Sequence, residues 1–570
     1  MGQPGEIEMI VYLAALVPLG MLIMTCCRGW ENVHLYPRSG KRRRQKLSQD
    51  GEESQRIRPM EFGSSFMFLG SWPTDTAMPQ VIITIFMYLD EAPDSSSVEA
   101  ACSKILRFNN FRSLPQRCRR HWILPTPTKC EWREIQVEPA DIITRVRVEG
   151  SAMVLREMER IKDSGLPPFT RDGRKQLPLW NLHVIENTDL REGPDGLGSV
   201  VAFRLHHTIG DGISLVAVAR DIFESAACND DHPPRTAGVG VVEALATGSR
   251  SDLKTFSRLG IGKTLLAMHE VVRQTLATSD TPLPFGHLEA PIARGRHGEL
   301  WDPIPSGQPQ GRKAFSGRRR IIIFPDIPLS LIKALKERGG TKVNDVMICL
   351  FSGCIRRYCK AMGAGSYMGG KAFKSRVMIP VALPRMMETE DKATILCNRW
   401  GLASTSLHVD EEDPAIRLEK IKVSSTKMKE TSVGVMNYLL QAHVMPWLPL
   451  SVCRKMVFKS LATQTLFLSN VPGPQEPTSF AGRRLRGLHF CFRNMMPQIG
   501  VLSLNGAVGA TLIVDPVATP ESLSLPSYYV DELKALMASL GVEDAKALEE
   551  VEGRRDRMTR TMIEAADLET

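Results

Sequence analysis

The sequence predicts a mixed α/β protein organised in two halves. Short runs rich in β-branched and aromatic residues alternate along the chain with longer segments whose apolar residues recur at helical spacing. The 570 residues exceed the size of one domain, and 43% hydrophobic with 24% charged residues is an ordinary globular balance. Composition therefore excludes wholesale disorder, collagen and a polytopic membrane protein.

The N-terminal region contains an uncharged run, Met9–Cys27, of 19 residues. This is about the length of one membrane-spanning helix, which Pro18 and Gly20 would kink. Glu6 and Glu8 precede the run and no small-residue cleavage site follows it, so it does not resemble a secretory signal peptide. We expect an N-terminal membrane helix. A helix that only dips into the bilayer interface is the alternative.

A basic cluster directly follows this run. Of the net charge of +9, Arg28–Lys46 carries seven basic side chains against Glu31 alone. Positive charge concentrated in one short segment indicates a local role for that segment rather than an extended nucleic-acid-binding surface. Positively charged segments that flank a membrane span stay on the cytosolic side. We therefore expect a single-pass protein that contacts the bilayer through residues 9–27, with the bulk of the chain in the cytosol. The endoplasmic reticulum is favoured over the plasma membrane.

Residues 1–60 are thus assigned to the anchor and a basic, polar linker, and residues 61–230 to a first domain. Its β-branched and aromatic runs predict strands, and its apolar residues at helical spacing predict helices. The strands are Val81–Leu89, Asn181–Ile185 and Ser199–Leu205, and the helices are Ser97–Arg107 and Ile213–Ala226.

Residues 231–318 are rich in Gly, Pro, Arg and Ser around one helix, Thr264–Thr275, and are expected to cross between the halves. Residues 319–545 form the second domain, and residues 546–570 a charged, helical and peripheral tail. The expected strands are Arg320–Phe324, Ser375–Ile379, Ala462–Leu468 and a hairpin-like pair in Val501–Asp515; the helices are Leu329–Arg338 and Val343–Cys359.

A second apolar segment, Met436–Phe458, is a poor membrane span. It holds Gln441, His443 and two prolines, Pro446 and Pro449. A buried helix pair is one interpretation. The other is a helix at the membrane surface or at the point where substrate enters.

The cysteines give no sign of a metal site. The chain has 12 of them, without a Cys-x-x-Cys pair or a His/Cys pattern at zinc spacing. We therefore expect reduced, mostly buried thiols and no bound metal.

The strongest chemical signal is the run His206-His207-Thr208-Ile209-Gly210-Asp211-Gly212, between an apolar strand and an amphipathic helix. Imidazole titrates near neutrality and can take a proton from an alcohol. Structural alternatives exist for each residue. One histidine could be packed in the core, Asp211 could cap the helix, and Gly212 could serve the turn.

Further motifs follow in order: Asn344-Asp345, Pro380-Val381, Asn398-Arg399-Trp400-Gly401 and Ser469-Asn470-Val471-Pro472-Gly473-Pro474. With His-His-x-x-x-Asp-Gly, this series resembles the bifunctional wax ester synthase/diacylglycerol acyltransferase family of chloramphenicol-acetyltransferase-like enzymes. The resemblance runs from about Phe62 to Leu540. One departure is Trp400, where many members carry Phe, a change that alters a pocket wall.

The resemblance implies two chloramphenicol-acetyltransferase-like domains, each a sheet flanked by helices, with a tunnel between them. It implies transfer of an acyl group from long-chain acyl-CoA, a co-substrate, to diacylglycerol or a long-chain fatty alcohol. Triacylglycerol or wax ester would be the product. No metal, bound cofactor or covalent enzyme intermediate is required.

The same resemblance assigns roles to residues. His207 would be the general base, and Asn344 the candidate oxyanion donor, with a helix N-cap as its structural alternative. Spacing alone would let Asp211 orient His207, but the resemblance implies that Asp211 pairs with an arginine and fixes the loop. The residues expected to support the loop or shape the tunnel are His206, Gly212, Asp345, Asn398, Gly401, Ser469, Asn470, Pro472 and Gly473.

Two other functions fit the same residues. One is a related acyl-CoA transferase with a soluble acceptor, and the other is a non-catalytic lipid-binding member of the fold. The preferred acceptor, the acyl chain length and the oligomeric state are open at this level.

Overall fold

The computed structural model describes residues 57–70, 81–117, 130–170, 173–189, 196–225, 261–275, 278–285, 287–288, 313–314, 316, 318–366, 368–370, 373–383, 396–493 and 496–568. The expected membrane helix over residues 9–27 and the basic cluster lie outside these residues. Each helix in the described part is too short or too polar to cross a bilayer.

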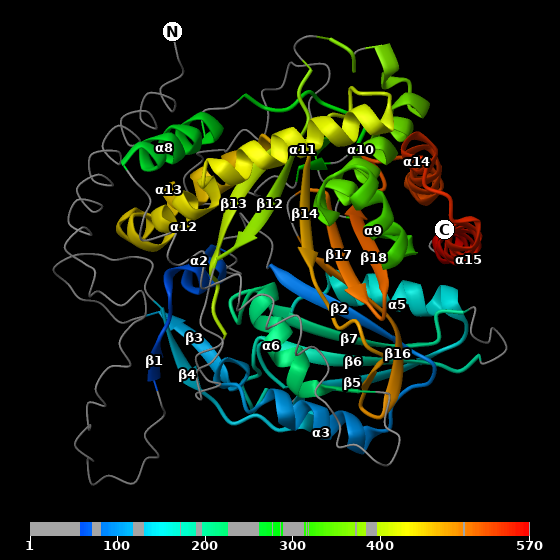
Figure 1. Cartoon of the computed structure of the whole chain (residues 1–570). Coiled ribbons are helices and arrows are strands. Elements are labelled where there is room, and N and C mark those ends of the chain that lie inside the picture. The colour runs from blue at the N-terminus through cyan, green and yellow to red at the C-terminus, as the bar shows by residue number, and fades with distance from the viewer. Residues whose placement is uncertain are drawn as a thin grey trace.

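Two large sheets, one per half, dominate the architecture (Figure 1). The sheet of the first half has the order β5-β6-β7-β2-β16-β15-β8. Its strands are β2 (Ile82–Leu89), β5 (Ile143–Val148), β6 (Trp180–Asn187), β7 (Ser199–His206), β8 (Phe223–Ser225), β15 (Thr478–Phe480) and β16 (Arg483–Phe492). A small sheet of β1 (Ile57–Pro59), β4 (Cys130–Glu134) and β3 (Ser113–Arg117) lies beside it.

The second sheet has the order β11-β18-β17-β14-β12-β13. Its strands are β11 (Arg320–Pro328), β12 (Arg376–Ala382), β13 (Trp400–Ser406), β14 (Leu466–Val471), β17 (Gln498–Leu504) and β18 (Ala507–Val514). Two short strands, β9 (His287–Leu288) and β10 (Lys313–Ala314), pair with each other. The α/β class is confirmed.

Helices cover both sheets. Those of the first half are α2 (Phe62–Gly70), α3 (Ser95–Ile105), α4 (Pro139–Ile142), α5 (Ser151–Asp163) and α6 (Gly212–Ile222). Those that follow are α8 (Ile261–Thr275), α9 (Leu329–Arg338), α10 (Val343–Ala361), α11 (Pro414–Glu430), α12 (Val433–His443), α13 (Leu450–Ala462), α14 (Leu525–Leu540) and α15 (Ala545–Asp567).

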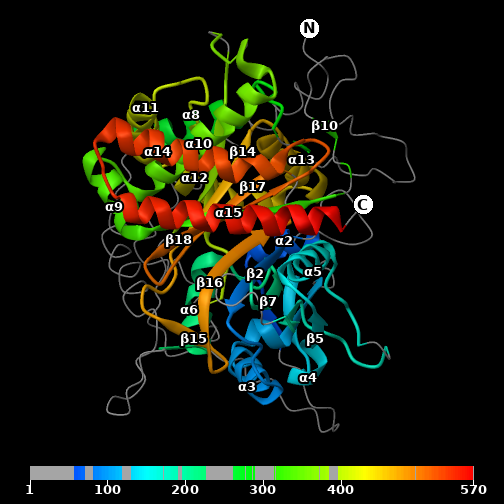
Figure 2. The ribbon, with the colours of Figure 1, turned by 90° about the vertical axis from the view of Figure 1, so that its right-hand side faces the viewer.

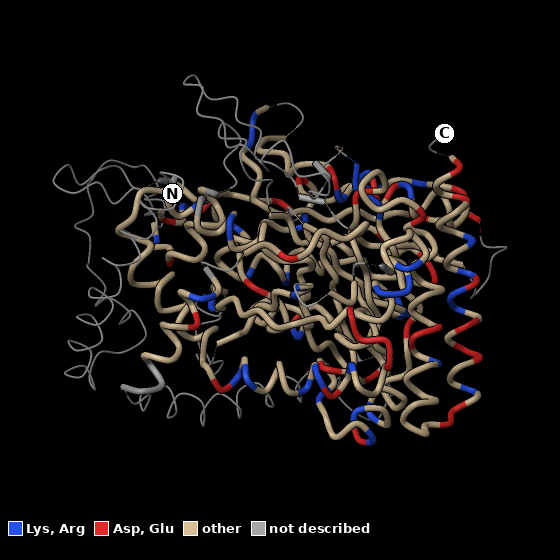
Figure 3. Tube along the Cα trace, turned by 90° about the horizontal axis from the view of Figure 1, so that it is seen from above, with Lys and Arg blue, Asp and Glu red and all other residues tan. Residues whose placement is uncertain are grey.

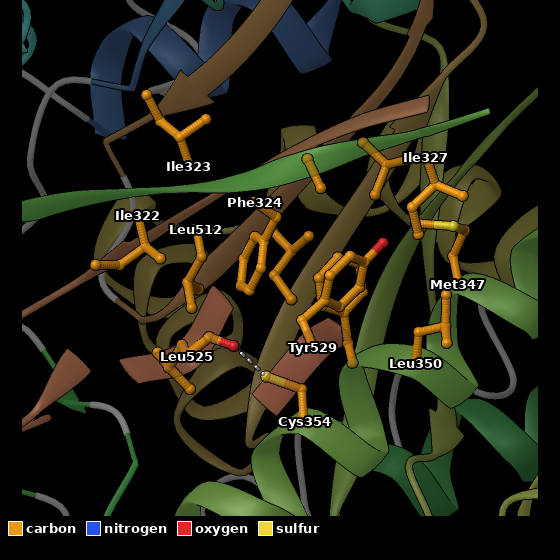
Figure 4. Close-up of a cluster of buried hydrophobic side chains, with 14 of the residues drawn as sticks. Ile322, Ile323, Phe324, Ile327, Met347, Leu350, Cys354, Leu512, Leu525 and Tyr529 are labelled. Atoms are coloured by element: carbon orange, nitrogen blue, oxygen red, sulfur yellow. Dashed lines mark hydrogen bonds between the residues drawn. The ribbon is translucent and has the colours of Figure 1, made fainter. Parts of the chain in front are cut away.

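The core of the second half shows how the sequence builds these layers. Apolar side chains of β11 and β18 pack against α10 and α14, whose buried faces carry Leu350 and Tyr529 (Figure 4). Phe324 and Tyr529 lie with their ring centroids 4.9 Å apart. Residues 345–355 of α10 are buried on every side, and their largely apolar side chains account for the position of this helix inside the core.

The second half contributes a strand pair to the sheet of the first half, which the expected domain boundaries at 230 and 319 do not capture. β16 pairs antiparallel with β2, and β15 pairs with β8, so Thr478–Phe492 lies in the sheet of the first half. The expected helix Ile213–Ala226 stops at Ile222 because the next three residues form β8. The expected strand at Ala462–Leu468 begins only at Leu466, since Ala462 ends α13.

The charged C-terminal segment is a helix, as expected, but it is not peripheral. α15 runs across both halves (Figure 2) and contacts β11 and α5. Val551 and Met562 are buried on its inner side, and the Ile323 N–H donates to the Met562 sulfur at 3.5 Å. Acidic and basic residues both occur along α15 (Figure 3), as its charged sequence indicated.

Candidate functional site

A cavity of about 380 Å³ lies where the two sheets meet. Its walls come from β2, β7, α6 and β16 of the first sheet and from β12, β13 and β14 of the second, and α2, α8, α12 and α13 also line it. The lining is predominantly aliphatic and aromatic. A cavity of this size and character suits an apolar ligand.

His207 is the imidazole that faces this cavity. β7 ends at His206, and main-chain hydrogen bonds from His206 N–H to Leu179 O and from His207 N–H to Val81 O, each 2.8 Å, fix the strand end. Because successive side chains of a strand point to opposite faces, His206 turns away from His207. His206 is 2% exposed, and its Nδ1 accepts from the Thr208 N–H at 3.1 Å.

Asn398 orients His207. The Asn398 Oδ1 lies 2.8 Å from the His207 Nδ1, and the Asn398 Nδ2 donates to the His207 carbonyl oxygen at 2.8 Å. An amide oxygen only accepts, so Nδ1 carries the ring proton and Nε2 keeps its lone pair. The family resemblance had implied only a supporting or tunnel-shaping role for Asn398. Its contact with His207 joins residues 191 positions apart, which no local pattern reports.

The surroundings keep the imidazole neutral. Burial lowers the pKa of His207, while the negative charge of Asp211 and the hydrogen bond that the ring donates to Asn398 act in the opposite direction. The lowered pKa favours the unprotonated ring at neutral pH, which is the form of an imidazole that can accept a proton.

Aromatic rings from both halves flank the imidazole. Trp400 of β13 and Phe492 of β16 each lie edge-on to it, with ring centroids 6.2 Å away. The Trp400 indole N–H also donates to Asn398 Oδ1 at 3.3 Å. The tryptophan thus adds a hydrogen bond to the site that a phenylalanine would lack.

Asp211 ties the motif loop to the second half. Its two carboxylate oxygens accept from the Ser214 N–H at 3.0 Å and from the Arg399 N–H at 2.9 Å. The first bond caps α6, and the second reaches an arginine through its main chain. Both bonds are structural, and neither touches the imidazole.

Replacing Asp211 by alanine should therefore lower stability and activity together. Loss of the cap leaves buried N–H groups unsatisfied, which costs on the order of 1–3 kcal/mol. Thermal melting and the esterification rate of the same preparation test this. A variant that melts like the wild type but is as inactive as His207→Ala would show that Asp211 acts in the chemistry itself.

Asn344 and Asp345 lie in the first turn of α10. Asp345 is buried and accepts from the Thr341 hydroxyl at 2.8 Å and the Lys342 N–H at 3.2 Å. Asn344 is exposed and is not part of the cavity wall; its Oδ1 accepts from the side chain of Asn470, which does line the cavity. The structure therefore places Asn344 one hydrogen bond behind the wall rather than beside His207.

The glycines of the motifs mark close main-chain approaches. A Cβ on Gly401 would lie 1.7 Å from the Gly434 oxygen, so only glycine lets β13 pack on α12. A Cβ on Gly473 would lie 2.2 Å from the Ser503 oxygen, and one on Gly212 3.0 Å from Val471. Cavity-lining residues of the 469–474 loop are Ser469, Asn470, Val471, Pro472, Gly473 and Pro474.

The apolar segment Met436–Phe458 forms the end of α12, a short turn Met445–Trp447 and most of α13. Leu440, Val444 and Met456 line the cavity, whereas Trp447 is 64% exposed. The segment is therefore not a wholly buried helix pair. It forms part of the cavity wall and reaches the surface.

Buried neutral histidines should make the fold sensitive to acid. Burial, with the neighbouring His207, lowers the pKa of His206 to about 3, and burial, with Arg204, lowers that of His183 to about 3. Below pH 6.5 the unfolded chain binds protons that the native state does not, so stability falls as the pH falls. Between pH 7 and pH 5 each histidine should remove about 2 kcal/mol from the free energy of unfolding.

Urea unfolding at pH 7 and pH 5 measures this loss. His206→Asn keeps an acceptor for the Thr208 N–H but does not titrate, so its loss should be smaller by the share of one histidine. An identical loss in wild type and variant would contradict the assignment.

The described part of the chain shows no cluster of three or more metal-ligating side chains and no disulfide. The cysteines it contains are free: Cys102, Cys130, Cys349, Cys354, Cys359, Cys397, Cys453 and Cys491. Burial raises the pKa of several of these thiols, for example that of Cys491 to about 12, so they are unreactive thiols at neutral pH.

Two family models match the chain. The wax ester synthase/diacylglycerol acyltransferase catalytic domain matches residues 174–347, and the C-terminal domain of the same family matches residues 396–537. Together they cover more than half of the sequence and include the motifs described above apart from Pro380-Val381, which lies between the two matched ranges.

Individual relatives are distant. A Mycobacterium tuberculosis H37Rv protein, named provisionally as a diacylglycerol O-acyltransferase, is 24% identical over 65% of this chain and 68% of its own. Wax ester synthase/diacylglycerol acyltransferase 6 of Arabidopsis thaliana is 21% identical over 65% of this chain and 73% of its own. The solved wax ester synthase/diacylglycerol acyltransferase of Marinobacter aquaeolei VT8 aligns over 84% of this chain and 98% of its own, with 16% identity and a TM-score of 0.49. The family assignment rests on the sequence matches.

Proposed function

Because this chain belongs to the wax ester synthase/diacylglycerol acyltransferase family, an acyl-CoA-dependent family of acyltransferases, we propose that it esterifies diacylglycerol or a long-chain fatty alcohol. His207 is the general base of this reaction. One observation carries the proposal. The His207 Nδ1 is held by Asn398 while the ring faces an apolar cavity, which directs a lone pair toward bound substrate.

The reaction then proceeds in two steps, and His207 takes up a proton in the first and returns it in the second. The His207 Nε2 takes the hydroxyl proton as the alcohol oxygen attacks the thioester carbonyl carbon. The tetrahedral intermediate collapses, the carbon–sulfur bond breaks, and the imidazolium returns the proton to the leaving CoA thiolate. The ester and free CoA leave, and the enzyme is unchanged.

The developing oxyanion needs a fixed donor. Asn344 remains the candidate from the resemblance, but its position favours a shared role with Asn470. The Asn470 side chain uses one N–H on the Asn344 oxygen and lines the cavity itself. We assign the donor to this asparagine pair, with Asn470 on the substrate side.

The cavity supports a lipid substrate. Each methylene transferred from water to an apolar wall contributes about 0.8 kcal/mol, so a long acyl chain gains many times the energy of a single hydrogen bond. The wall includes flexible methionines, Met67, Met87, Met268, Met445 and Met456, which adapt to chains of different shape.

Membrane attachment through residues 9–27, with the catalytic part in the cytosol at the endoplasmic reticulum, belongs to the same proposal. Lipid acceptors reside in bilayers, and the basic residues 41–44 favour anionic headgroups on the cytosolic side.

Deleting residues 1–46 should release the protein from membranes and leave the active site intact. The truncated enzyme should esterify substrates in detergent but work poorly on substrates in vesicles. Carbonate extraction followed by fractionation tests the prediction. If the truncated protein stays in the membrane pellet, another segment inserts, and Met436–Phe458, with its exposed Trp447, is the first to examine.

A substrate panel tests the proposed reaction. Purified protein with labelled long-chain acyl-CoA and either diacylglycerol, a long-chain alcohol or a soluble alcohol should release CoA and form a lipid ester. Ester from the soluble alcohol alone would indicate the related transferase class. Acyl-CoA binding without CoA release would indicate a lipid-binding protein.

A further inference from the structure

α2 lies on the far side of Asn398 from His207. Its first turn packs so closely that a Cβ on Gly63 would be 2.9 Å from the Asn398 main-chain oxygen. Ser64 and Ser65 are both buried in this turn. The sequence pattern drew attention to none of these residues, because the segment carries no recognisable motif.

A chain of hydrogen bonds runs from His207 into this helix. The Asn398 Nδ2 donates to the Ser64 Oγ at 2.9 Å, and the Ser64 hydroxyl in turn donates to the Glu61 carboxylate. The same carboxylate accepts from the Asn398 main-chain N–H at 2.9 Å. The Thr208 hydroxyl donates to the Ser64 carbonyl oxygen at 2.7 Å, which ties the motif loop to the same turn.

Each bond in the chain has only one possible direction. A carboxylate oxygen only accepts, so Glu61 fixes the Ser64 hydroxyl as its donor. The Ser64 oxygen is then left as an acceptor and requires the Nδ2 side of the Asn398 amide. That amide must therefore turn its oxygen to the His207 Nδ1.

Reversal of this amide would disable the base. With Nδ2 facing His207, the Nδ1 would have to accept, and the ring proton would move to Nε2. Nε2 could then no longer take a proton from the acceptor alcohol.

We propose that Glu61 and Ser64 are positioning residues that hold the Asn398 amide in the orientation required for His207 to act as a base. The proposal rests on the proposed function of His207. Burial has the largest effect and raises the pKa of Glu61, while the hydrogen bonds from Ser64 and Asn398 oppose that rise.

The same helix touches the substrate space. Phe62, Gly63, Phe66 and Met67 line the cavity. α2 therefore joins the wall that a lipid chain contacts to the residues that orient the base. Displacement of α2 would loosen both together.

Ser64→Ala removes one acceptor of the Asn398 Nδ2, which also donates to the His207 carbonyl oxygen, and Ser65→Ala is its matched control. Ser65 is the next residue of the same turn, it is 1% exposed, and its hydroxyl makes no hydrogen bond in the described structure. We expect Ser64→Ala to lower kcat by about 10- to 100-fold, less than the 10²- to 10⁴-fold that a general base itself contributes. Ser65→Ala should change kcat less than threefold, because the Ser65 hydroxyl makes no hydrogen bond to the residues that orient His207.

The pH profile separates positioning from a general loss of structure. The hydrogen bond from the His207 Nδ1–H to Asn398 raises the pKa of His207, so loss of this bond should move the acid limb of kcat/KM to lower pH. Restoring a hydroxyl with Ser64→Thr should return both kcat and the acid limb toward wild type. A second pair avoids dependence on one variant: Glu61→Gln keeps an acceptor oxygen and should retain more activity than Glu61→Leu.

Two outcomes are distinct. If Ser64→Ala matches Ser65→Ala in kcat and pH profile while His207→Ala is inactive, the positioning role is wrong and the base stands. If His207→Ala is active, the proposed function of His207 fails first.

Discussion

Replacing His207 by alanine should lower kcat by about 10²- to 10⁴-fold and leave the fold intact, the range expected when a general base is removed. The side chain is half-buried in a cavity wall, so its removal enlarges a space that is already open to ligand. The esterification rate in detergent, with melting temperature measured alongside, gives the result.

His206→Asn is the control for this prediction. His206 points away from the cavity, and an asparagine can still accept from the Thr208 N–H. It should retain far more activity than His207→Ala. Equal loss in both variants at unchanged melting temperature, or wild-type rates in His207→Ala, would contradict the assignment of the base.

Changing Asn398 should produce the second large effect, because Asn398 decides which nitrogen of His207 carries the proton. Asn398→Ala should approach the loss seen in His207→Ala, since the ring is then free to take the wrong tautomer. Circular dichroism would show whether the fold persists. Rates within threefold of wild type would mean that the imidazole is held by other contacts.

Asn398→Asp tests the electrostatics of the same contact. It retains an acceptor for the Nδ1 proton but places a negative charge beside the ring, which raises the pKa of His207. The neutral ring is the active form, so the acid limb of kcat/KM should move to higher pH. Activity should fall most at pH 6 and recover in part at pH 8. An acid limb that moves down instead would place the titration on another group.

Much of the site could be predicted because its chemistry is local. The His206–Gly212 motif spans seven residues at a strand-to-helix junction. Its Asp211 caps α6 by accepting from the main-chain N–H of Ser214, three positions further along the chain. Both boundaries of the helix Leu329–Arg338 were predicted correctly. The apolar spacing that marks the helix and the glycines Gly339-Gly340 that follow it are adjacent in the chain.

What could not be predicted depends on distant partners. Asn398 meets His207 across 191 positions, and Ser64 meets Asn398 across 334. The location of Asn344 behind Asn470 likewise follows from how α10 packs beside β14. A motif shows that a residue is special; only the folded chain shows what it touches.

The insertion of β15 and β16 into the sheet of the first half also affects how the molecule reaches its folded state. β2 and β16 pair directly although about four hundred residues separate them, so the central ladder of the first sheet closes one of the longest loops in the chain. During synthesis the first half emerges complete in sequence but with β2 unpaired along one edge. Until β16 has been synthesised, this edge of β2 is exposed to chaperones and to other chains. The two halves should consequently gain and lose structure as one cooperative unit, and fragments cut at the boundary between them should not fold alone.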